Sequence, residues 1–229
     1  MGIFNRTNET GGVTLSKSAS MVIFDLDGTL WDAGQSLAES WGVKICDLAG
    51  VDKRFTAEDI HGVMGLTMDE IADNLLPEVE TPRRYEIFDA CMDYELEYLR
   101  DHGGVLYPQV KETLLELLKS GRKLTIVSNC QEDYVKTFLD SMDMWEYFCD
   151  YEEWGRTGML KADNIRYVME RNGIEHAIYV GDIQKDADAA AEAGIPCIWA
   201  AYGFGQIRNP AGVIREFAEL PAVLDEIGY

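Results

Sequence analysis

The sequence MVIFDLDGTL, residues 21–30, decides the fold of this chain. Its first four residues are apolar, rich in β-branched and aromatic side chains, and do not alternate with polar ones. Such a short run is typical of a strand that is buried on both faces of a parallel sheet. Asp25 and Asp27 follow the run, and Gly28 then permits a sharp turn. The stretch therefore predicts a strand that ends in two carboxylates.

Three more short apolar runs follow, and helical patterns separate them. The runs lie at residues 124–127, 177–180 and 197–200. Amphipathic or alanine-rich patterns of helical period occupy residues 109–120, 131–140, 162–172 and 184–193. Strands and helices in alternation predict an α/β fold with right-handed crossovers. We expect a Rossmann-like parallel sheet with helices on both faces.

The stretch between the first and second apolar runs is about 100 residues long, too long for a single crossover. Most of it has helical character. The spacing of Thr67 and Glu70 predicts a capping box at a helix start, and Thr56 with Asp59 is a weaker form of the same signal. The sequence therefore predicts an all-helical domain inserted at residues 36–103.

These patterns divide the chain into three parts. Residues 1–20 are polar and without a sustained period, which predicts a loosely ordered lead-in. Residues 21–35 and 104–229 are expected to form the α/β core, with the helical insertion as a cap. The last part of the core, from residue 207, has no signature beyond a terminal helix.

Composition excludes several classes of protein. The 229 residues carry a formal net charge of −21, and a sequence pI of about 4.4 argues against nucleic acid or an anionic membrane as the main partner. No apolar run approaches the roughly 18 residues of a membrane span, and no signal peptide is recognisable. Five scattered cysteines without a C-x-x-C pair indicate reduced thiols. We expect a cytoplasmic protein.

The acidic excess is concentrated in the predicted insertion. Residues 36–103 hold 16 acids and 6 bases, a net charge of −10, whereas residues 104–229 hold 21 acids and 12 bases, a net charge of −9. Most of this charge is expected on solvated helix faces, where it keeps the protein in solution. The question is which few carboxylates have a chemical role.

Asp25 and Asp27 are the first candidates. Alternation in an extended segment places their side chains on the same side, and ligands of open α/β sheets bind beyond the carboxyl ends of the strands. Two carboxylates there form a hard oxygen site suited to Mg²⁺, and either one can act as a nucleophile or as an acid and base. The alternative is a structural Asx turn.

Polar residues also follow the other predicted strands. Ser128 and Asn129 follow the second apolar run and can hold a phosphate oxygen, although this pair is also a common strand-to-helix link. Asp182 and Asp186 lie one helical turn apart after the third run and can face one cation, or can simply stabilise a helix N-terminus. Lys161 opens a predicted helix; it is either a surface lysine or the cation of a phosphate site.

Taken in order, the motifs D-x-D-G-T, S-N, K and G-D-x-x-x-D resemble the haloacid dehalogenase superfamily of Mg²⁺-dependent phosphatases, in its branch with a helical cap between the first two motifs. Two further stretches are also similar to that branch: Leu106 to Gly121, and Ala190 to Pro196. The resemblance covers about residues 21–206, nearly the whole chain.

The resemblance implies a role for each site residue. Asp25 would be the nucleophile that forms an aspartyl-phosphate, and Asp27 the general acid and base. The ligands of Mg²⁺ would be the Asp25 side chain, the Asp27 backbone carbonyl and the Asp182 side chain, with Asp186 behind them or reaching the metal through water. Ser128 and Lys161 would hold phosphate oxygens. The residues expected to bind substrate are Gly28, Thr29, Ser128, Asn129 and Lys161.

The resemblance also orders the possible reactions. A phosphatase for a small phosphorylated metabolite is expected, with phosphoglycolate as the family's usual example. A β-phosphoglucomutase-like enzyme is the alternative, but the segment 61–67, where the family places its specificity loop, has no arginine. Asp27 disfavours a dehalogenase, and neither Lys44 nor Lys53 is marked as the Schiff-base lysine of a phosphonatase. An inactive relative that only binds a ligand is the remaining hypothesis.

His61 is the first residue of the segment 61–67. It is expected to have a structural partner or to contact substrate.

Overall fold

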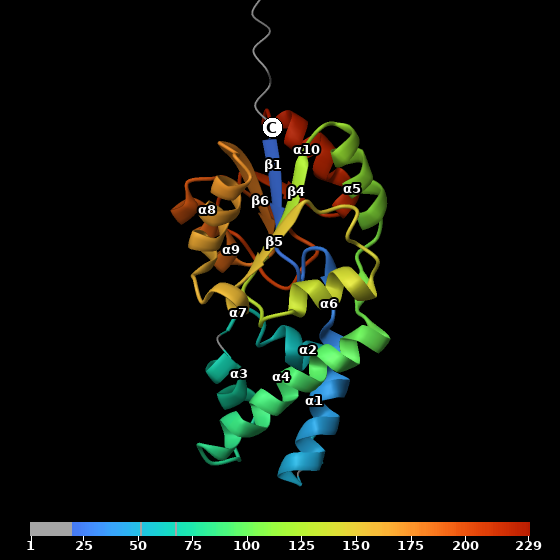
Figure 1. Cartoon of the computed structure of the whole chain (residues 1–229), viewed down its shortest axis with the longest axis vertical. Coiled ribbons are helices and arrows are strands. Elements are labelled where there is room, and N and C mark those ends of the chain that lie inside the picture. Colours follow the sequence, from blue (N-terminus) through green and yellow to red (C-terminus); the bar gives the residue numbers. More distant parts are fainter. Residues whose placement is uncertain (1–19, 51, 67) are drawn as a thin grey trace, which may run out of the picture.

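A computed structural model describes residues 20–50, 52–66 and 68–229 of the chain (Figure 1). The predicted lead-in at residues 1–20 lies outside the described residues except for Ser20. The capping box predicted for Thr67 and Glu70 also lies outside them, because Thr67 is not described.

The centre of the protein is a parallel sheet, as predicted. Its described strands are ordered β5-β4-β1-β6-β7-β8, and every neighbouring pair runs parallel. Their bounds are Ser20–Phe24 (β1), Lys123–Ser128 (β4), Asp150–Glu153 (β5), His176–Gly181 (β6), Cys197–Ala200 (β7) and Gly212–Ile214 (β8). The four strands expected from apolar runs are confirmed as β1, β4, β6 and β7. Phe24 pairs with Ile126 on one side and with Val180 on the other, so the segments that follow β1, β4 and β6 leave the sheet at one edge.

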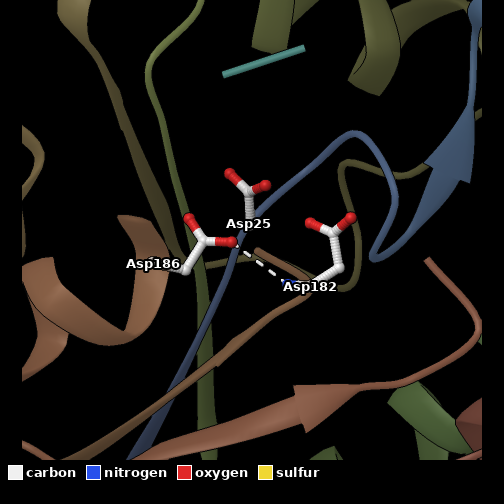
Figure 2. Close-up of side chains that lie close together, drawn as sticks. All are labelled: Asp25, Asp182 and Asp186. Carbon is white, nitrogen blue, oxygen red and sulfur yellow. Dashed lines mark hydrogen bonds between the residues drawn. The ribbon is translucent and has the colours of Figure 1, made fainter. Parts of the chain in front are cut away.

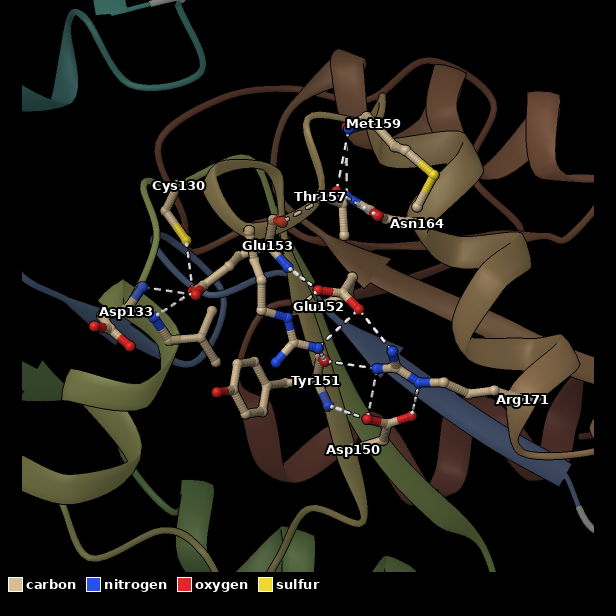
Figure 3. A network of polar contacts seen from close by, with 12 residues as sticks. Cys130, Asp133, Asp150, Tyr151, Glu152, Glu153, Thr157, Met159, Asn164 and Arg171 are labelled. Carbon is tan, nitrogen blue, oxygen red and sulfur yellow. Dashed lines mark hydrogen bonds and ion pairs between the residues drawn. The ribbon is translucent and has the colours of Figure 1, made fainter.

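The two edge strands were not predicted, because they have no apolar run. The strand β5 has the sequence DYEE, and β8 has only three residues, beginning with Gly212. Figure 3 shows why the polar β5 is stable: Arg171 of α8 (Lys161–Arg171) pairs with Asp150 at 2.6 Å and with Glu152 at 2.7 Å. An edge strand can be stabilised by such contacts from a neighbouring helix instead of by its own apolar side chains.

Helices cover both faces of the sheet. Along β1, Val22 and Phe24 belong to one apolar cluster, whereas Met21 and Ile23 belong to another. In Figure 1, α8 and α9 lie on one side of the strands and α5 and α10 on the other. The bounds of the helices around the sheet are Val110–Lys119 (α5), Tyr134–Ser141 (α6), Trp154–Thr157 (α7), Gln184–Ala193 (α9) and Leu220–Glu226 (α10), with a 3₁₀ turn at Phe217–Glu219. The Rossmann-like fold and the terminal helix are confirmed.

The stretch between β1 and β4 is helical, and it leaves and rejoins the core through a short antiparallel pair. The two strands of that pair are Trp31–Asp32 (β2) and Val105–Leu106 (β3), with Trp31 opposite Leu106. The described helices between them are Gly34–Ala49 (α1), Ala57–His61 (α2), Met68–Leu75 (α3) and Arg83–His102 (α4). Figure 1 shows them grouped at one end of the molecule, below the carboxyl ends of the strands. Their division from the core as a separate domain stays a prediction.

One predicted helix start within this stretch is confirmed. The Thr56 hydroxyl accepts a hydrogen bond from the backbone N–H of Asp59 at 3.2 Å, and the Asp59 carboxylate accepts one from the backbone N–H of Thr56 at 2.8 Å. This reciprocal pair is a capping box at the start of α2.

In the part of the chain that the structure describes, no helix has the length and apolar character needed to cross a bilayer.

Candidate active site

The segment after β1 holds Asp25 and Asp27 at the edge of the sheet. The backbone N–H of Asp25 donates to the Val180 carbonyl at 2.9 Å, so Asp25 is held as a continuation of the strand. Asp25 as a whole residue is only 6% exposed. At Gly28, φ is +79°, and a Cβ there would lie 2.3 Å from Oδ2 of Asp182. A residue without a side chain is therefore required where the turn passes Asp182.

Lys161 is the buried cation of this site. It is the first residue of α8, it is 7% exposed, and its Nζ lies 2.9 Å from Oδ1 of Asp25 and 2.6 Å from Oδ1 of Asp186. Burial alone would lower the pKa of Lys161, but the charges of Asp186 and Asp25 outweigh burial and raise it. The lysine is therefore a permanent positive charge beside Asp25.

Asp182 and Asp186 differ in how their oxygens are used. Oδ2 of Asp186 accepts from the backbone N–H groups of Asp182 at 3.1 Å and Ile183 at 3.2 Å, and Oδ1 accepts from Lys161. Asp182 accepts one described hydrogen bond, from the backbone N–H of Phe204 at 2.7 Å. Both oxygens of Asp186 are thus engaged by the protein, whereas Asp182 keeps acceptor capacity.

Three carboxylates meet at this point. Asp25, Asp182 and Asp186 each offer an oxygen, and these oxygens lie within 4.8 Å of one another (Figure 2). The pKa of Asp25 is raised to about 6, and the pKa of Asp182 is raised to about 8. In both groups burial is the largest cause and the charge of Asp186 is the second, while the charge of Lys161 acts in the opposite direction. A set of hard oxygen donors with an unfavourable excess of negative charge fits a divalent cation such as Mg²⁺.

Asp27 lies beside this cluster in a different environment. The Tyr134 hydroxyl donates to Oδ1 of Asp27 at 3.1 Å. Burial, then the neighbouring charge of Asp25, raises the pKa of Asp27 to about 8. Asp27 is therefore protonated at neutral pH, as a proton donor must be, while Asp25 keeps the lower pKa of the two.

One cavity joins most of the predicted site residues. It encloses about 90 Å³, and the predicted residues that line it are Asp25, Asp27, Ser128, Asn129, Lys161 and Asp182. Gly28, Thr29 and Asp186 do not line it. The Thr29 side chain is fully buried, and its hydroxyl has no hydrogen-bond partner among the described residues. The strand ends thus bring six of the nine predicted residues to one cavity.

A polar network behind the cavity supports the loops that carry Ser128 and Lys161 (Figure 3). The Glu153 carboxylate accepts from the backbone N–H groups of Asp133 at 2.7 Å and Val135 at 2.9 Å, which holds the start of α6 against β5. Before α8, the Thr157 hydroxyl accepts from the backbone N–H of Met159 at 3.1 Å. The same Thr157 hydroxyl donates a hydrogen bond to Oδ1 of the buried Asn164 at 2.9 Å.

The helical stretch contributes a loop to the cavity. Met64, Gly65 and Leu66 line it, in the segment where the resemblance placed a specificity loop. At Gly65, φ is +78°, and a Cβ there would lie 2.6 Å from Cδ1 of Ile183. The Lys185 ammonium donates to the Gly65 carbonyl. The loop therefore touches the core closely at Gly65.

His61 has structural partners instead of a place in the cavity. Its Nε2 lies 2.9 Å from Oδ1 of Asp32, and its ring stacks on Phe204 with 4.2 Å between centroids. Because the backbone of Phe204 holds Asp182, this stacking links α2 to the carboxylate cluster.

Several cavity residues were missed by sequence reasoning. Tyr134 contacts Asp27 from 107 positions away, and Trp41 and Glu95 reach the cavity from α1 and α4. No short motif contains these residues. A buried acid on the apolar stripe of the helix at 83–102 was the one available signal, because Glu95 follows Cys91 by one helical turn.

Comparison with known proteins now identifies the family. The sequence model of the family described as haloacid dehalogenase-like hydrolase matches residues 22–200. The chain belongs to this family. A phosphoglycolate phosphatase of Pseudomonas syringae pv. tomato is 30% identical to it over 91% of this chain and 81% of the relative. The predicted family is confirmed, and the chain is a phosphatase, a phosphoric monoester hydrolase, of this family.

Solved structures agree on the fold. The crystal structure of a predicted phosphoglycolate phosphatase from Haemophilus somnus superimposes with a TM-score of 0.78 at 22% identity, over 90% of this chain and 97% of that one. A putative phosphatase from Clostridium difficile gives a TM-score of 0.75 at 24% identity, over 91% of this chain and 100% of that one.

Proposed function

We propose that this enzyme is a Mg²⁺-dependent phosphatase that hydrolyses a small organic phosphomonoester through an aspartyl-phosphate intermediate. One observation carries the proposal. The buried Asp25 carboxylate lies 2.9 Å from the Lys161 ammonium, and it shares its cavity with Asp27 and Asp182. An anionic nucleophile, an acid beside it and a fixed cation are the parts that phosphoryl transfer requires.

The first step forms a bond between an Asp25 oxygen and phosphorus. The bond from phosphorus to the ester oxygen breaks, and the leaving alkoxide takes the proton held by Asp27. In the second step water attacks phosphorus and gives a proton to the Asp27 carboxylate, and the bond between phosphorus and the Asp25 oxygen breaks. Inorganic phosphate leaves, and both aspartates return to their starting states. Dividing hydrolysis into two in-line displacements lets the same groups serve both.

The proposed metal ligands are the side chains of Asp25 and Asp182 and the backbone carbonyl of Asp27. When bound there, Mg²⁺ supplies positive charge to the phosphoryl oxygens. Asp186 is proposed to stand behind the ligands, because its oxygens already accept from Lys161 and from two backbone N–H groups. We propose that Asp186 orients the side chain of Lys161.

The remaining site residues are proposed to position the phosphoryl group. Ser128 and Asn129 follow β4 and line the cavity beside Lys161, where their polar groups can donate to phosphoryl oxygens. Gly28 and Thr29 lie away from the cavity lining, and we propose that they act on substrate through the backbone of the turn after β1.

The helical stretch is proposed to act as a cap over the site, because Met64, Gly65 and Leu66 line the cavity together with Asp25. A hydrolase is favoured over a mutase of sugar bisphosphates, since no arginine occurs among the described residues that line the cavity. A bisphosphate would need a second strong anion site.

Phosphate release from a panel of esters, measured with Mg²⁺ and with EDTA, tests this function. The panel includes phosphoglycolate, the substrate in the name of the relative from Pseudomonas syringae. Mg²⁺-dependent release supports the proposal. Conversion of β-glucose 1-phosphate to the 6-phosphate without phosphate release would favour the mutase, and no turnover of any ester would favour a binding relative.

A further inference from the structure

A carboxyl group from the helical stretch is built into the same cavity as the nucleophile. Glu95 of α4 is 2% exposed and lines the cavity together with Trp41 of α1. The Trp41 indole Nε1 donates to Oε2 of Glu95 at 2.5 Å, and the Gln131 side-chain amide donates to Oε1. Gln131 is itself fixed, because its Nε2 also donates to the Met92 carbonyl at 2.9 Å.

Glu95 has no cation as a partner among the described residues. Burying a carboxyl group without a cation beside it is unfavourable in free energy. A helix that only packs against its neighbours usually has an apolar residue at such a position. Burial raises the pKa of Glu95 to about 8, against the opposing hydrogen bonds from Trp41 and Gln131. The charge of Asp27 adds to this shift, so Glu95 and the site's acid lie in one electrostatic environment.

Neither of the described cations of the cavity contacts Glu95. Among the described residues that line it, the cations are Lys161 and Lys185. Lys161 is paired with Asp25 and Asp186, and the exposed Lys185 donates to the Gly65 carbonyl. The other lining residues that α1, α3 and α4 contribute are apolar; they are Leu37, Trp41, Ile71 and Met92. A second anionic group of the substrate that lies at Glu95 would therefore meet a carboxyl group and apolar side chains, whereas the positive charge of Lys185 lies at the loop that contains Gly65.

We propose that Glu95 selects the substrate class: a phosphomonoester of a short amino alcohol, whose ammonium group donates to the Glu95 carboxyl. An ester that ends in a neutral hydroxyl ranks second, and an ester that ends in a carboxylate, such as phosphoglycolate, ranks last. This inference rests on the proposed phosphatase function and makes its substrate specific. When Glu95 is ionised, above its pKa of about 8, its opposite charge favours the first ester, and its like charge in a confined, poorly solvated space disfavours the last.

Three esters of nearly equal size test the ranking: O-phosphoethanolamine, 2-hydroxyethyl phosphate and phosphoglycolate. We expect kcat/KM at pH 9, above the pKa of Glu95, and at saturating Mg²⁺ to fall in that order, with at least about a tenfold difference between the first and last, which corresponds to 1.4 kcal/mol. Glu95→Gln keeps the size of the side chain and removes its charge, so the first and last esters should become nearly equal. Glu97→Gln makes the same change at an exposed position of α4 and should keep the wild-type ranking.

Two results would overturn the inference while leaving the phosphatase in place: phosphoglycolate as the best of the three esters, or an unchanged ranking in Glu95→Gln. If Glu95→Gln does not fold, the wild-type ranking still decides. If no ester is turned over, the proposed function fails. Calorimetric binding of the three esters to the Asp25→Asn variant then ranks them without catalysis, and tighter binding of phosphoglycolate than of O-phosphoethanolamine would refute the role of Glu95.

Discussion

At the scale of single residues, the site separates groups of the same chemical type by their surroundings. Asp25 has a lysine 2.9 Å away, Asp27 has a tyrosine hydroxyl, and Asp186 has two backbone N–H groups and the same lysine. The pKa of Asp25 is raised to about 6 and that of Asp27 to about 8. Their environment, more than their residue type, distinguishes the proposed nucleophile, Asp25, from the proposed acid, Asp27.

Replacing the proposed nucleophile tests the chemistry directly. Asp25→Asn should lower kcat by a factor on the order of 10³ or more, because the amide cannot form the phosphoryl bond. The circular dichroism spectrum should be unchanged. Asp188→Asn, at an exposed position of α9, is the matched control and should retain activity. Substantial Mg²⁺-dependent turnover by Asp25→Asn would refute the assignment.

Glu95 also predicts a pH dependence of stability. Its pKa is raised from 4.5 to about 8 in the folded protein, so the folded state keeps a proton that the unfolded state releases between these values. Its contribution to the free energy of unfolding is present below pH 4.5 and is lost as the pH rises toward 8. Urea unfolding at several pH values in EDTA should show wild type losing stability relative to Glu95→Gln, by up to about 1.4 kcal/mol per pH unit. Parallel curves would contradict the raised pKa, and Glu97→Gln should follow wild type.

At the scale of elements, the site depends on how loops are attached to the sheet edge. Ser128 ends β4 and Lys161 begins α8, so the segment after the first and the segment before the second must be held in place. Glu153 and Asn164 attach these segments through hydrogen bonds to backbone and hydroxyl groups. The polar strand β5 is therefore part of the support of the active site.

Glu153→Gln tests this support. An amide can accept from only one of the N–H groups of Asp133 and Val135, and its own N–H₂ lies against the other, which leaves a buried donor unpaired. We expect a loss of about 1–3 kcal/mol in the free energy of unfolding and a higher KM. Glu132→Gln, one position before the contacted turn and exposed, is the control. Equal stability of the two variants would show that the hydrogen bonds of Glu153 are unimportant.

The loop at Gly65 makes a second prediction at this scale. Gly65→Ala places a methyl group 2.6 Å from Ile183 and forces an unfavourable φ, so the loop must move away from the core. A displacement of about 1 Å near a reacting group can reduce kcat/KM by up to about 100-fold. Gly62→Ala is the control, because φ there is −65° and the new methyl group would lie 3.4 Å from its nearest neighbour. Equal kcat/KM in both variants would refute a positioning role for the loop.

The extent of sequence-based prediction follows from the range of the interactions. The central strands and the cluster of Asp25, Ser128, Lys161 and Asp182 were predictable, because short buried runs mark the strands and parallel strands end at one edge. The strand β5 was not, since Arg171 stabilises it from another element. Glu95 was also missed as a cavity residue: its partners Trp41 and Gln131 lie 54 and 36 positions away, and no local pattern records them.

At the scale of the whole molecule, the net charge of −21 opposes the approach of a phosphate ester. The excess is densest in residues 36–103, the stretch that lies over the cavity. Near the phosphoryl group, the positive charge of Lys161 and of a metal ion in the proposed site offsets this negative potential. At 0.15 M ionic strength the screening length is about 8 Å, so the distant charges matter mainly at low salt.

This balance predicts the effect of salt on the reaction. With Mg²⁺ saturating, kcat/KM should rise modestly when an inert salt is added from low ionic strength to about 0.15 M, because screening removes long-range repulsion. Stopped-time phosphate assays over a series of salt concentrations measure this. A steep fall would indicate that the substrate is attracted by a positive field, contrary to the charge distribution described above.

The pairing of Trp31 with Leu106 has a consequence for how such an enzyme can diversify. The chain leaves the core and returns to it at adjacent positions of one antiparallel pair, whose Cα atoms are about 5 Å apart in any such pair. Any insert whose two ends lie at that separation is compatible with the same core, whatever its length or fold. Selectivity for new esters can therefore be acquired by exchanging residues 33–104, while the aspartates proposed to be catalytic keep their places at the ends of the strands.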